Sequence, residues 1–63
     1  MRRTQLIRHL KRHGAALVRE GRRHSIFAIG PHRTQIPRHV EIVDALAKKI
    51  CKDLKIPFPK GGR

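Results

Sequence analysis

The sequence predicts a single two-layer α+β domain with the element order α-β-β-β-α. Three observations lead to this fold class: apolar residues recur at helical spacing near both ends, short β-branched runs fill the middle, and turn-forming residues separate those runs. A chain of 63 residues has room for one thin core only. Because each helix must bury its apolar stripe, we expect both helices to pack on one face of a three-stranded antiparallel sheet.

The first helix is predicted over residues 4–13. Leu6, Ile7 and Leu10 follow the spacing of one helix face. Thr4 is the expected N-cap, and Gly14 is the expected glycine at the C-terminal end. The remaining faces are rich in Arg, Lys and His, which either solvate the helix or contact phosphate.

Three strands are predicted over residues 15–19, 25–29 and 34–36. Each is a short and partly β-branched run, and the breaks between them contain glycine or proline. Two such short connections produce an antiparallel meander. We expect the third strand to end at Pro37, since proline has no N–H to donate to the ladder.

Helical spacing returns in the last third of the chain, and the second helix is expected to begin between Glu41 and Asp44. Its apolar residues recur at steps of three and four: Val43, Leu46, Ala47, Ile50 and Leu54. Pro57 ends the helical pattern. Residues 1–56 are therefore predicted to form one domain, followed by a flexible C-terminal tail over 57–63.

The predicted core takes apolar residues from all five elements. Its members are Leu6, Leu10, Leu17, Phe27, Ile36, Leu46, Ile50 and Leu54.

The charge of the chain indicates an anionic partner. Lys and Arg number 16 against 4 acids, so the formal net charge is +12 and the pI is about 11.8. A domain this basic is typical of nucleic-acid binding. No apolar stretch is long enough to span a membrane and no signal peptide is visible, so we expect a soluble cytoplasmic protein without a membrane partner.

Several chemistries lack the residues that they need. The single cysteine, Cys51, excludes a disulfide framework and a thiolate zinc site within one chain. His9 and His13 stand four residues apart on a helix, but the intervening residues supply no carboxylate ligand, so no metal is expected. The few acids make a catalytic carboxylate pair implausible, and no phosphate-binding glycine loop is present, so no cofactor is expected either.

His24 is the one residue whose surroundings favour catalysis. It directly follows Arg22 and Arg23 and enters the second strand. RNA cleavage needs a base for the 2′-hydroxyl, an acid for the leaving 5′-oxygen and positive charge near the phosphate, and a histidine beside arginines supplies much of this. An ordinary surface histidine has the same local sequence, so spacing alone leaves both interpretations open.

Taken from end to end, the chain resembles the HicA family of ribonuclease toxins over about residues 4–56. The resemblance rests on the order and spacing of several features: the initial helix, Gly14, the turn before His24-Ser25-Ile26-Phe27, the segment Ile36-Pro37-Arg38-His39, and the closing helix with Leu46, Ile50 and Leu54.

This resemblance implies a fold like that of a double-stranded-RNA-binding domain and an activity of mRNA cleavage that does not depend on translation. The catalytic histidine of the family falls on His24, and a loop histidine with a supporting role falls on His39. The chain departs from the family in having Arg22-Arg23 where Gly-Ser commonly precedes the histidine, and Lys55 where a glycine often ends the last helix.

The resemblance also implies a protein partner, an antitoxin of the HicB kind. A surface with a net charge of +12 is best masked by an acidic patch. We expect this partner to cover the open side of the sheet around His24, including Arg22, Arg23 and His39, rather than the helix side.

Two classes of function remain open from the sequence: a ribonuclease toxin, and a non-catalytic RNA-binding module such as a ribosomal or nucleoid-associated protein. Only Phe27 and Phe58 are aromatic, so recognition of the RNA backbone should dominate over base stacking in either case. The expected RNA contacts are Arg22, Arg23, Arg33, Arg38 and His39.

Overall fold

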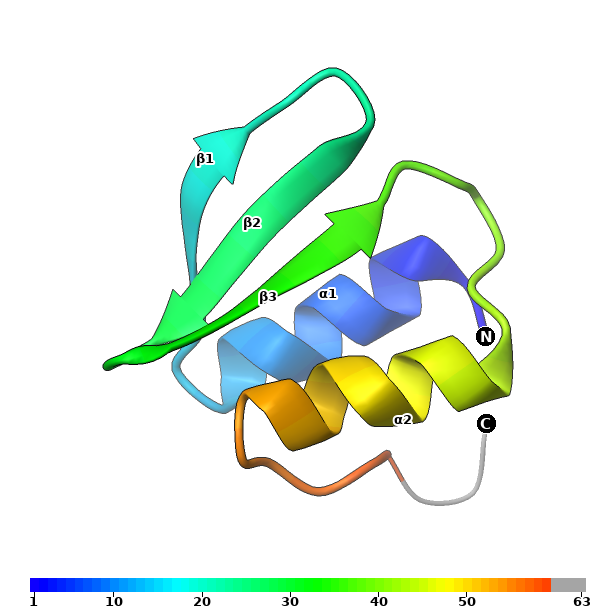
Figure 1. Cartoon of the computed structure of the whole chain (residues 1–63). Coiled ribbons are helices and arrows are strands. Elements are labelled where there is room, and N and C mark those ends of the chain that lie inside the picture. Colours follow the sequence, from blue (N-terminus) through cyan, green and yellow to red (C-terminus); the bar gives the residue numbers. More distant parts are fainter. Residues whose placement is uncertain (60–63) are drawn as a thin grey trace.

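The computed structural model of the chain describes residues 1–59, which contain five elements in the predicted order. They are α1 (Arg3–Arg12), β1 (Ala16–Glu20), β2 (His24–Ile29), β3 (His32–Pro37) and α2 (Asp44–Asp53). Figure 1 shows α1 and α2 side by side beneath the sheet, running in the same direction. The predicted α+β class, with two helices and a three-stranded antiparallel sheet, is thus confirmed.

The sheet is an antiparallel meander in the order β1-β2-β3. Phe27 of β2 lies opposite Thr34 of β3, and both are buried, so these positions face the helices. Alternate residues therefore point to the open face, since side chains in a strand alternate between its two sides. The pairing of β1 with β2 shifts between Leu17 and Arg19, which marks a β-bulge.

The core lies between the sheet and the two helices. Its buried apolar members are Leu6, Leu10, Ala15, Phe27, Ile36, Ile42, Ala47, Ile50, Cys51 and Leu54. Full burial of one of the larger side chains contributes about 1.5–3 kcal/mol. All predicted core residues except Leu17 and Leu46 belong to this set, and Leu46 packs against it while only partly buried.

Leu17 is 50% exposed, so the prediction that it belongs to the core is wrong. It lies opposite Phe27 and therefore on the side of the sheet that faces the helices. However, β1 is an edge strand, and all of its residues are exposed. The helix layer does not extend far enough under this edge to cover Leu17, a limit that the alternation of residues along the strand does not reveal.

The start of α1 differs from the prediction because it pairs with the segment that precedes α2. The backbone N–H of Arg3 donates to the carbonyl oxygen of Val40 at 2.8 Å. Arg2, not Thr4, is the N-cap residue, and its backbone N–H donates to Oε1 of Gln5 at 3.1 Å. A contact between distant parts of the chain thus decides where the helix begins.

Each helix is followed, two residues after its end, by a residue with left-handed backbone conformation. Gly14, with φ of 93°, follows α1 as predicted. Lys55 takes the equivalent place after α2, with φ of 61°, and the next N–H, of Ile56, donates to the carbonyl oxygen of Cys51 at 3.0 Å. This is the hydrogen bond of a Schellman motif, in which glycine is the usual left-handed residue.

The predicted tail over 57–63 lies partly outside the described residues. Within the described part, Phe58 packs against the core, and Nε2 of His9 lies 2.7 Å from the carbonyl oxygen of Pro57, which accepts a hydrogen bond. Within residues 1–59, no helix combines the length and the apolar character that crossing a membrane requires.

Candidate functional site

A hollow of about 660 Å³ lies along the free edge of β3, and residues of the sheet and of α2 line it. Side chains from both faces of β3 reach it, as do residues of β2, α2 and the loop between β3 and α2. The lining residues are His24, Ile26, Arg33, Thr34, Gln35, Pro37, His39, Leu46, Lys49, Ile50 and Asp53.

Two histidines share this hollow. His24 begins β2 and lies directly opposite Pro37, the last residue of β3. The pairing continues one step further, because the backbone N–H of Arg38 donates to the carbonyl oxygen of Arg23 at 3.2 Å. His39 follows the paired residue Arg38 directly, and the side chains of His24 and His39 are both exposed.

The charged groups of the hollow come from β3 and α2. Arg33 is exposed on the open face, and Lys49 extends from α2. Asp53 is the one acid that lines the hollow; its Oδ2 lies 3.1 Å from Nζ of Lys49 and accepts a hydrogen bond from Oγ1 of Thr34 at 3.1 Å. Lys49 and Thr34 already engage the Asp53 carboxylate. Arg33 and the two histidines are therefore the groups of the hollow that could bind an anion.

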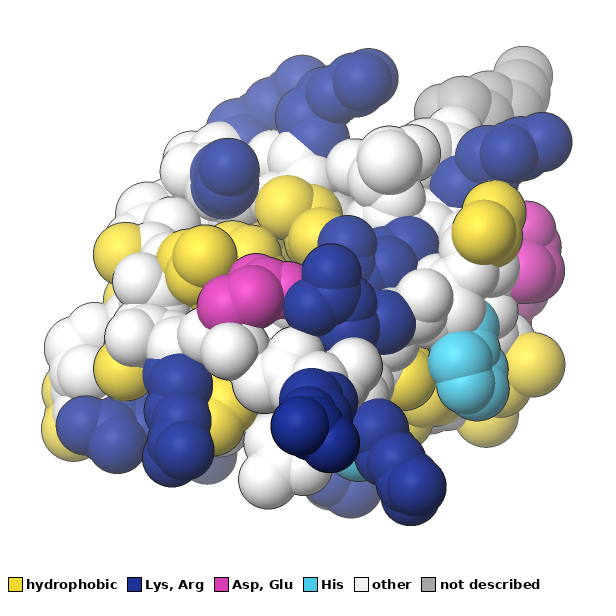
Figure 2. All heavy atoms as spheres, turned by 90° about the horizontal axis from the view of Figure 1, so that it is seen from above, with side chains coloured by type: hydrophobic (Ala, Val, Ile, Leu, Met, Phe, Trp, Pro, Cys, Tyr) yellow, Lys and Arg dark blue, Asp and Glu magenta, His cyan; other side chains and the backbone are white. Residues whose placement is uncertain are grey.

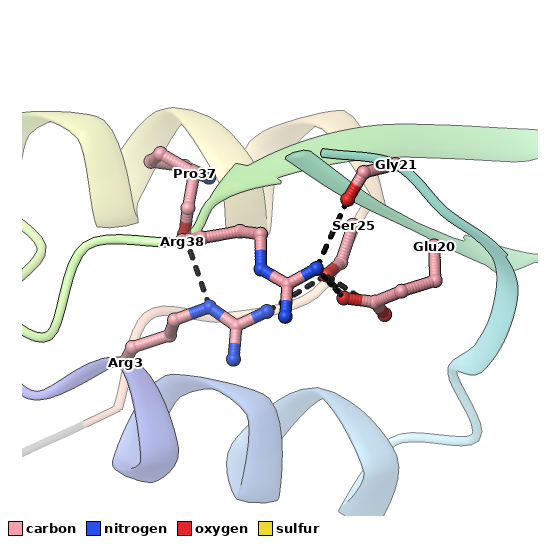
Figure 3. A network of polar contacts seen from close by, with 6 residues as sticks. All are labelled: Arg3, Glu20, Gly21, Ser25, Pro37 and Arg38. Carbon is pink, nitrogen blue, oxygen red and sulfur yellow. Dashed lines mark hydrogen bonds and ion pairs between the residues drawn. The ribbon is translucent and has the colours of Figure 1, made fainter. Parts of the chain in front are cut away.

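A polar network lies behind the two histidines, on the helix side of the sheet (Figure 3). Nη2 of Arg3 donates to the buried hydroxyl of Ser25 at 2.7 Å, and its Nε donates to the carbonyl oxygen of Pro37 at 3.0 Å. The Ser25 hydroxyl in turn donates to the Glu20 carboxylate, at 3.1 Å from each oxygen. This carboxylate also forms an ion pair with Arg38.

The network joins all three strand ends to the start of α1. Within residues 1–59, every buried side-chain nitrogen or oxygen has a hydrogen-bond partner. Ser25 is the neighbour of His24, and Arg38 is the neighbour of His39. The contacts of Ser25 and Arg38 therefore hold the backbone that carries both histidines.

The structure brings together only some of the residues that the sequence indicated. His24, Arg33 and His39 line one hollow, whereas Arg22 and Arg23 are exposed in the turn between β1 and β2 and do not line it. The guanidinium of Arg38 is engaged within the chain: Nη1 donates to the carbonyl oxygen of Gly21 at 3.0 Å and pairs with Glu20. Figure 2 shows Lys and Arg side chains spread widely over the face seen from above, with hydrophobic side chains between them.

Sequence reasoning missed Lys49 and Gln35 as site residues. Gln35 is two residues from Arg33 in β3 and so lies on the same face, but the strand predicted over 34–36 does not include Arg33. Lys49 follows Leu46 by three residues and thus shares its helix face. No sequence signal shows that this face of α2 borders the free edge of β3.

The other histidines and the cysteine have surroundings of a different kind. The rings of His9 and His13 contact edge to face with centroids 4.6 Å apart, and His9 is engaged by Pro57. Among residues 1–59, no group of three or more His, Cys, Asp or Glu residues could hold a metal ion. Cys51 is buried in the core, and this burial raises the pKa of its thiol.

Comparison with protein-family models, with curated proteins and with solved structures found no match to this chain.

Proposed function

We propose that the chain is a HicA-type toxin, an mRNA endoribonuclease that uses His24 and needs no metal. The observation that carries this proposal is the hollow itself, in which the exposed His24 shares one surface with His39 and Arg33. An imidazole and a guanidinium at one concave surface are the groups that RNA cleavage through the 2′-hydroxyl requires.

The architecture supports the same function. Within residues 1–59, both helices lie on one face of the sheet, and the other face is open to RNA (Figure 1). The element order α-β-β-β-α and the parallel helices agree with the fold like a double-stranded-RNA-binding domain that the resemblance implies. RNA bound to this open face would reach the hollow at the edge of β3.

The chemistry proceeds by proton transfer. A neutral imidazole removes the proton of a 2′-hydroxyl, and the oxygen attacks the adjacent phosphorus while Arg33 stabilises the charge that develops on the phosphate. The bond from phosphorus to the 5′-oxygen breaks, and that oxygen takes up a proton. The products carry a 2′,3′-cyclic phosphate and a 5′-hydroxyl.

Expression in a bacterial host tests this function in cells. The wild-type chain should arrest growth on induction, and His24→Ala should not. His32→Gln serves as a control, because His32 does not line the hollow. If His24→Ala arrests growth as strongly as the wild type, the chain is not a ribonuclease that depends on His24. A chain that binds RNA without arrest or cleavage is the non-catalytic RNA-binding module instead.

The proposed protein partner is a HicB-like antitoxin with an acidic contact surface. A net charge of +12 favours rapid encounter with such a partner. Stopping turnover requires more than weakening RNA binding, so the partner should cover His24. Amide exchange of the complex should show protection around His24 and His39; a complex that blocks cleavage while the His24 side of the sheet remains open would contradict occlusion.

A further inference from the structure

We propose that His39 is the second proton-transfer group of the site, so that His24 and His39 act as an acid and base pair. This inference rests on the proposed ribonuclease function and assigns His39 a direct role in the reaction, beyond RNA contact. The structure describes five histidines, and only these two line the hollow.

The end of the β2–β3 pairing brings His24 and His39 to the same hollow. His24 is opposite Pro37 at the end of β3, and His39 follows Pro37 by two residues in the loop toward α2. Both residues are exposed and line the same hollow. A phosphate placed between them would present its 2′-oxygen to one ring and its 5′-oxygen to the other.

Contacts of Arg38 fix the position of the His39 backbone relative to the start of β2. Arg38 precedes His39, and its guanidinium bonds the carbonyl oxygen of Gly21 and pairs with Glu20, both in the segment that leads to His24. The backbone N–H of Arg38 also donates to the carbonyl oxygen of Arg23 at 3.2 Å. His39 is therefore attached to the strand end that carries His24, although it lies outside β3.

The remaining charged groups of the hollow suit an acid and base pair. Arg33 from β3 offers positive charge, and Asp53 from α2 is occupied by Lys49 and Thr34. No carboxylate in the described hollow is left unpaired to act as the second proton-transfer group. His39 is then the group best placed to complement His24.

The reaction balances with these two residues alone. The neutral imidazole takes the 2′-hydroxyl proton as the 2′-oxygen bonds to phosphorus, and the protonated imidazole gives its proton to the 5′-oxygen as the bond from phosphorus to that oxygen breaks. The pair ends with its protons exchanged, and exchange with water restores the starting state. No oxidant, metal or further reactant takes part.

A sulfur-substituted substrate separates proton transfer from a structural role. An RNA oligonucleotide carries 2′-O-methyl groups at all positions but one, which is placed at a linkage that the wild-type protein cleaves in unmodified RNA. The 5′-bridging atom of that linkage is oxygen in one version and sulfur in the other. A thiolate leaves without protonation, so only loss of the general acid is rescued by sulfur.

On the oxygen substrate, His24→Gln and His39→Gln should each slow cleavage by about 10²- to 10⁴-fold, while His32→Gln stays near the wild-type rate. On the sulfur substrate, one of the two slow variants should return to near the wild-type rate, and the other should stay slow. The rescued variant identifies the general acid. Circular dichroism of each variant checks that it is folded.

Two results would overturn this role of His39. One is cleavage of the oxygen substrate by His39→Gln within a few-fold of wild type while His24→Gln is inactive, which leaves the ribonuclease function intact. The other is a slow His39→Gln variant with no rescue by sulfur of either variant, which indicates a structural role. Failure of the wild-type protein to cleave unmodified RNA refutes the proposed function itself, and this inference with it.

Discussion

Lys55 adopts a backbone conformation that a residue with a side chain occupies at a cost. Its φ of 61° lies in the left-handed region, where residues other than glycine lose about 1–2 kcal/mol. Glycine carries no such cost but loses more entropy on folding. Lys55→Gly should therefore stabilise the domain by about 0.5–1 kcal/mol, measured as a rise in the midpoint of thermal unfolding.

Lys52→Gly is the matched control for this change. Lys52 is also exposed and lies three residues earlier, inside α2, so the variant removes the same charge from a helical position. Glycine there should destabilise the domain by about 0.5–1 kcal/mol. Equal losses from both substitutions would show that the left-handed residue after α2 carries no strain.

At the level of single residues, part of the candidate site could be predicted from the sequence. His24 is indicated by the arginines beside it, whereas Arg33 is indicated only by its charge, because the strand predicted over 34–36 begins after it. The ion pair of Arg38 with Glu20 could not be predicted. It forms only because the pairing of β1, β2 and β3 brings the ends of the three strands together. Contacts of this kind depend on register, which a single sequence specifies poorly.

At the level of elements, the periodic patterns predicted the number, order and type of helices and strands. The second strand, expected over 25–29, is His24–Ile29, and the third, expected over 34–36, is His32–Pro37. The ends differ where tertiary contacts decide them. The start of α1 depends on a hydrogen bond to Val40, and the exposure of β1 depends on the reach of the helix layer.

A second prediction concerns the face of α2 that packs against the core. Ile50 and Leu46 both line the hollow, but Ile50 is fully buried, whereas Leu46 is only partly buried. Ile50→Ala should cost about 2–5 kcal/mol, a large share of the stability of so small a domain. Leu46→Ala should cost clearly less, since its side chain already meets solvent.

Urea unfolding of the two variants provides the comparison, with the midpoint and slope fitted together. A larger loss for Leu46→Ala than for Ile50→Ala would mean that α2 is rotated about its axis relative to the arrangement described.

At the scale of the whole molecule, the dominant property is a net charge of +12 on a surface with few acids. Each phosphate that the protein neutralises releases counterions and contributes about 0.7–0.9 to the slope of log affinity against log salt concentration. Binding to a fully 2′-O-methylated RNA, which cannot be cleaved through a 2′-hydroxyl, should therefore weaken steeply as salt rises.

The structure adds detail to this third prediction. Arg33→Gln should reduce the slope by about the value of one contact, because Arg33 is exposed in the hollow. Arg38→Gln should change the slope less, since Glu20 already engages that guanidinium. A slope near zero for the wild-type protein would contradict RNA binding by charge.

The most direct test of the central claim is cleavage of RNA by the purified protein in the presence of EDTA. We predict that the wild-type chain cleaves, that its products end in 2′,3′-cyclic phosphate and 5′-hydroxyl groups, and that His24→Gln loses about 10²- to 10⁴-fold in rate. Products with 3′-hydroxyl and 5′-phosphate ends, or complete loss of cleavage on chelation, would instead indicate a metal-activated water and contradict the role of His24.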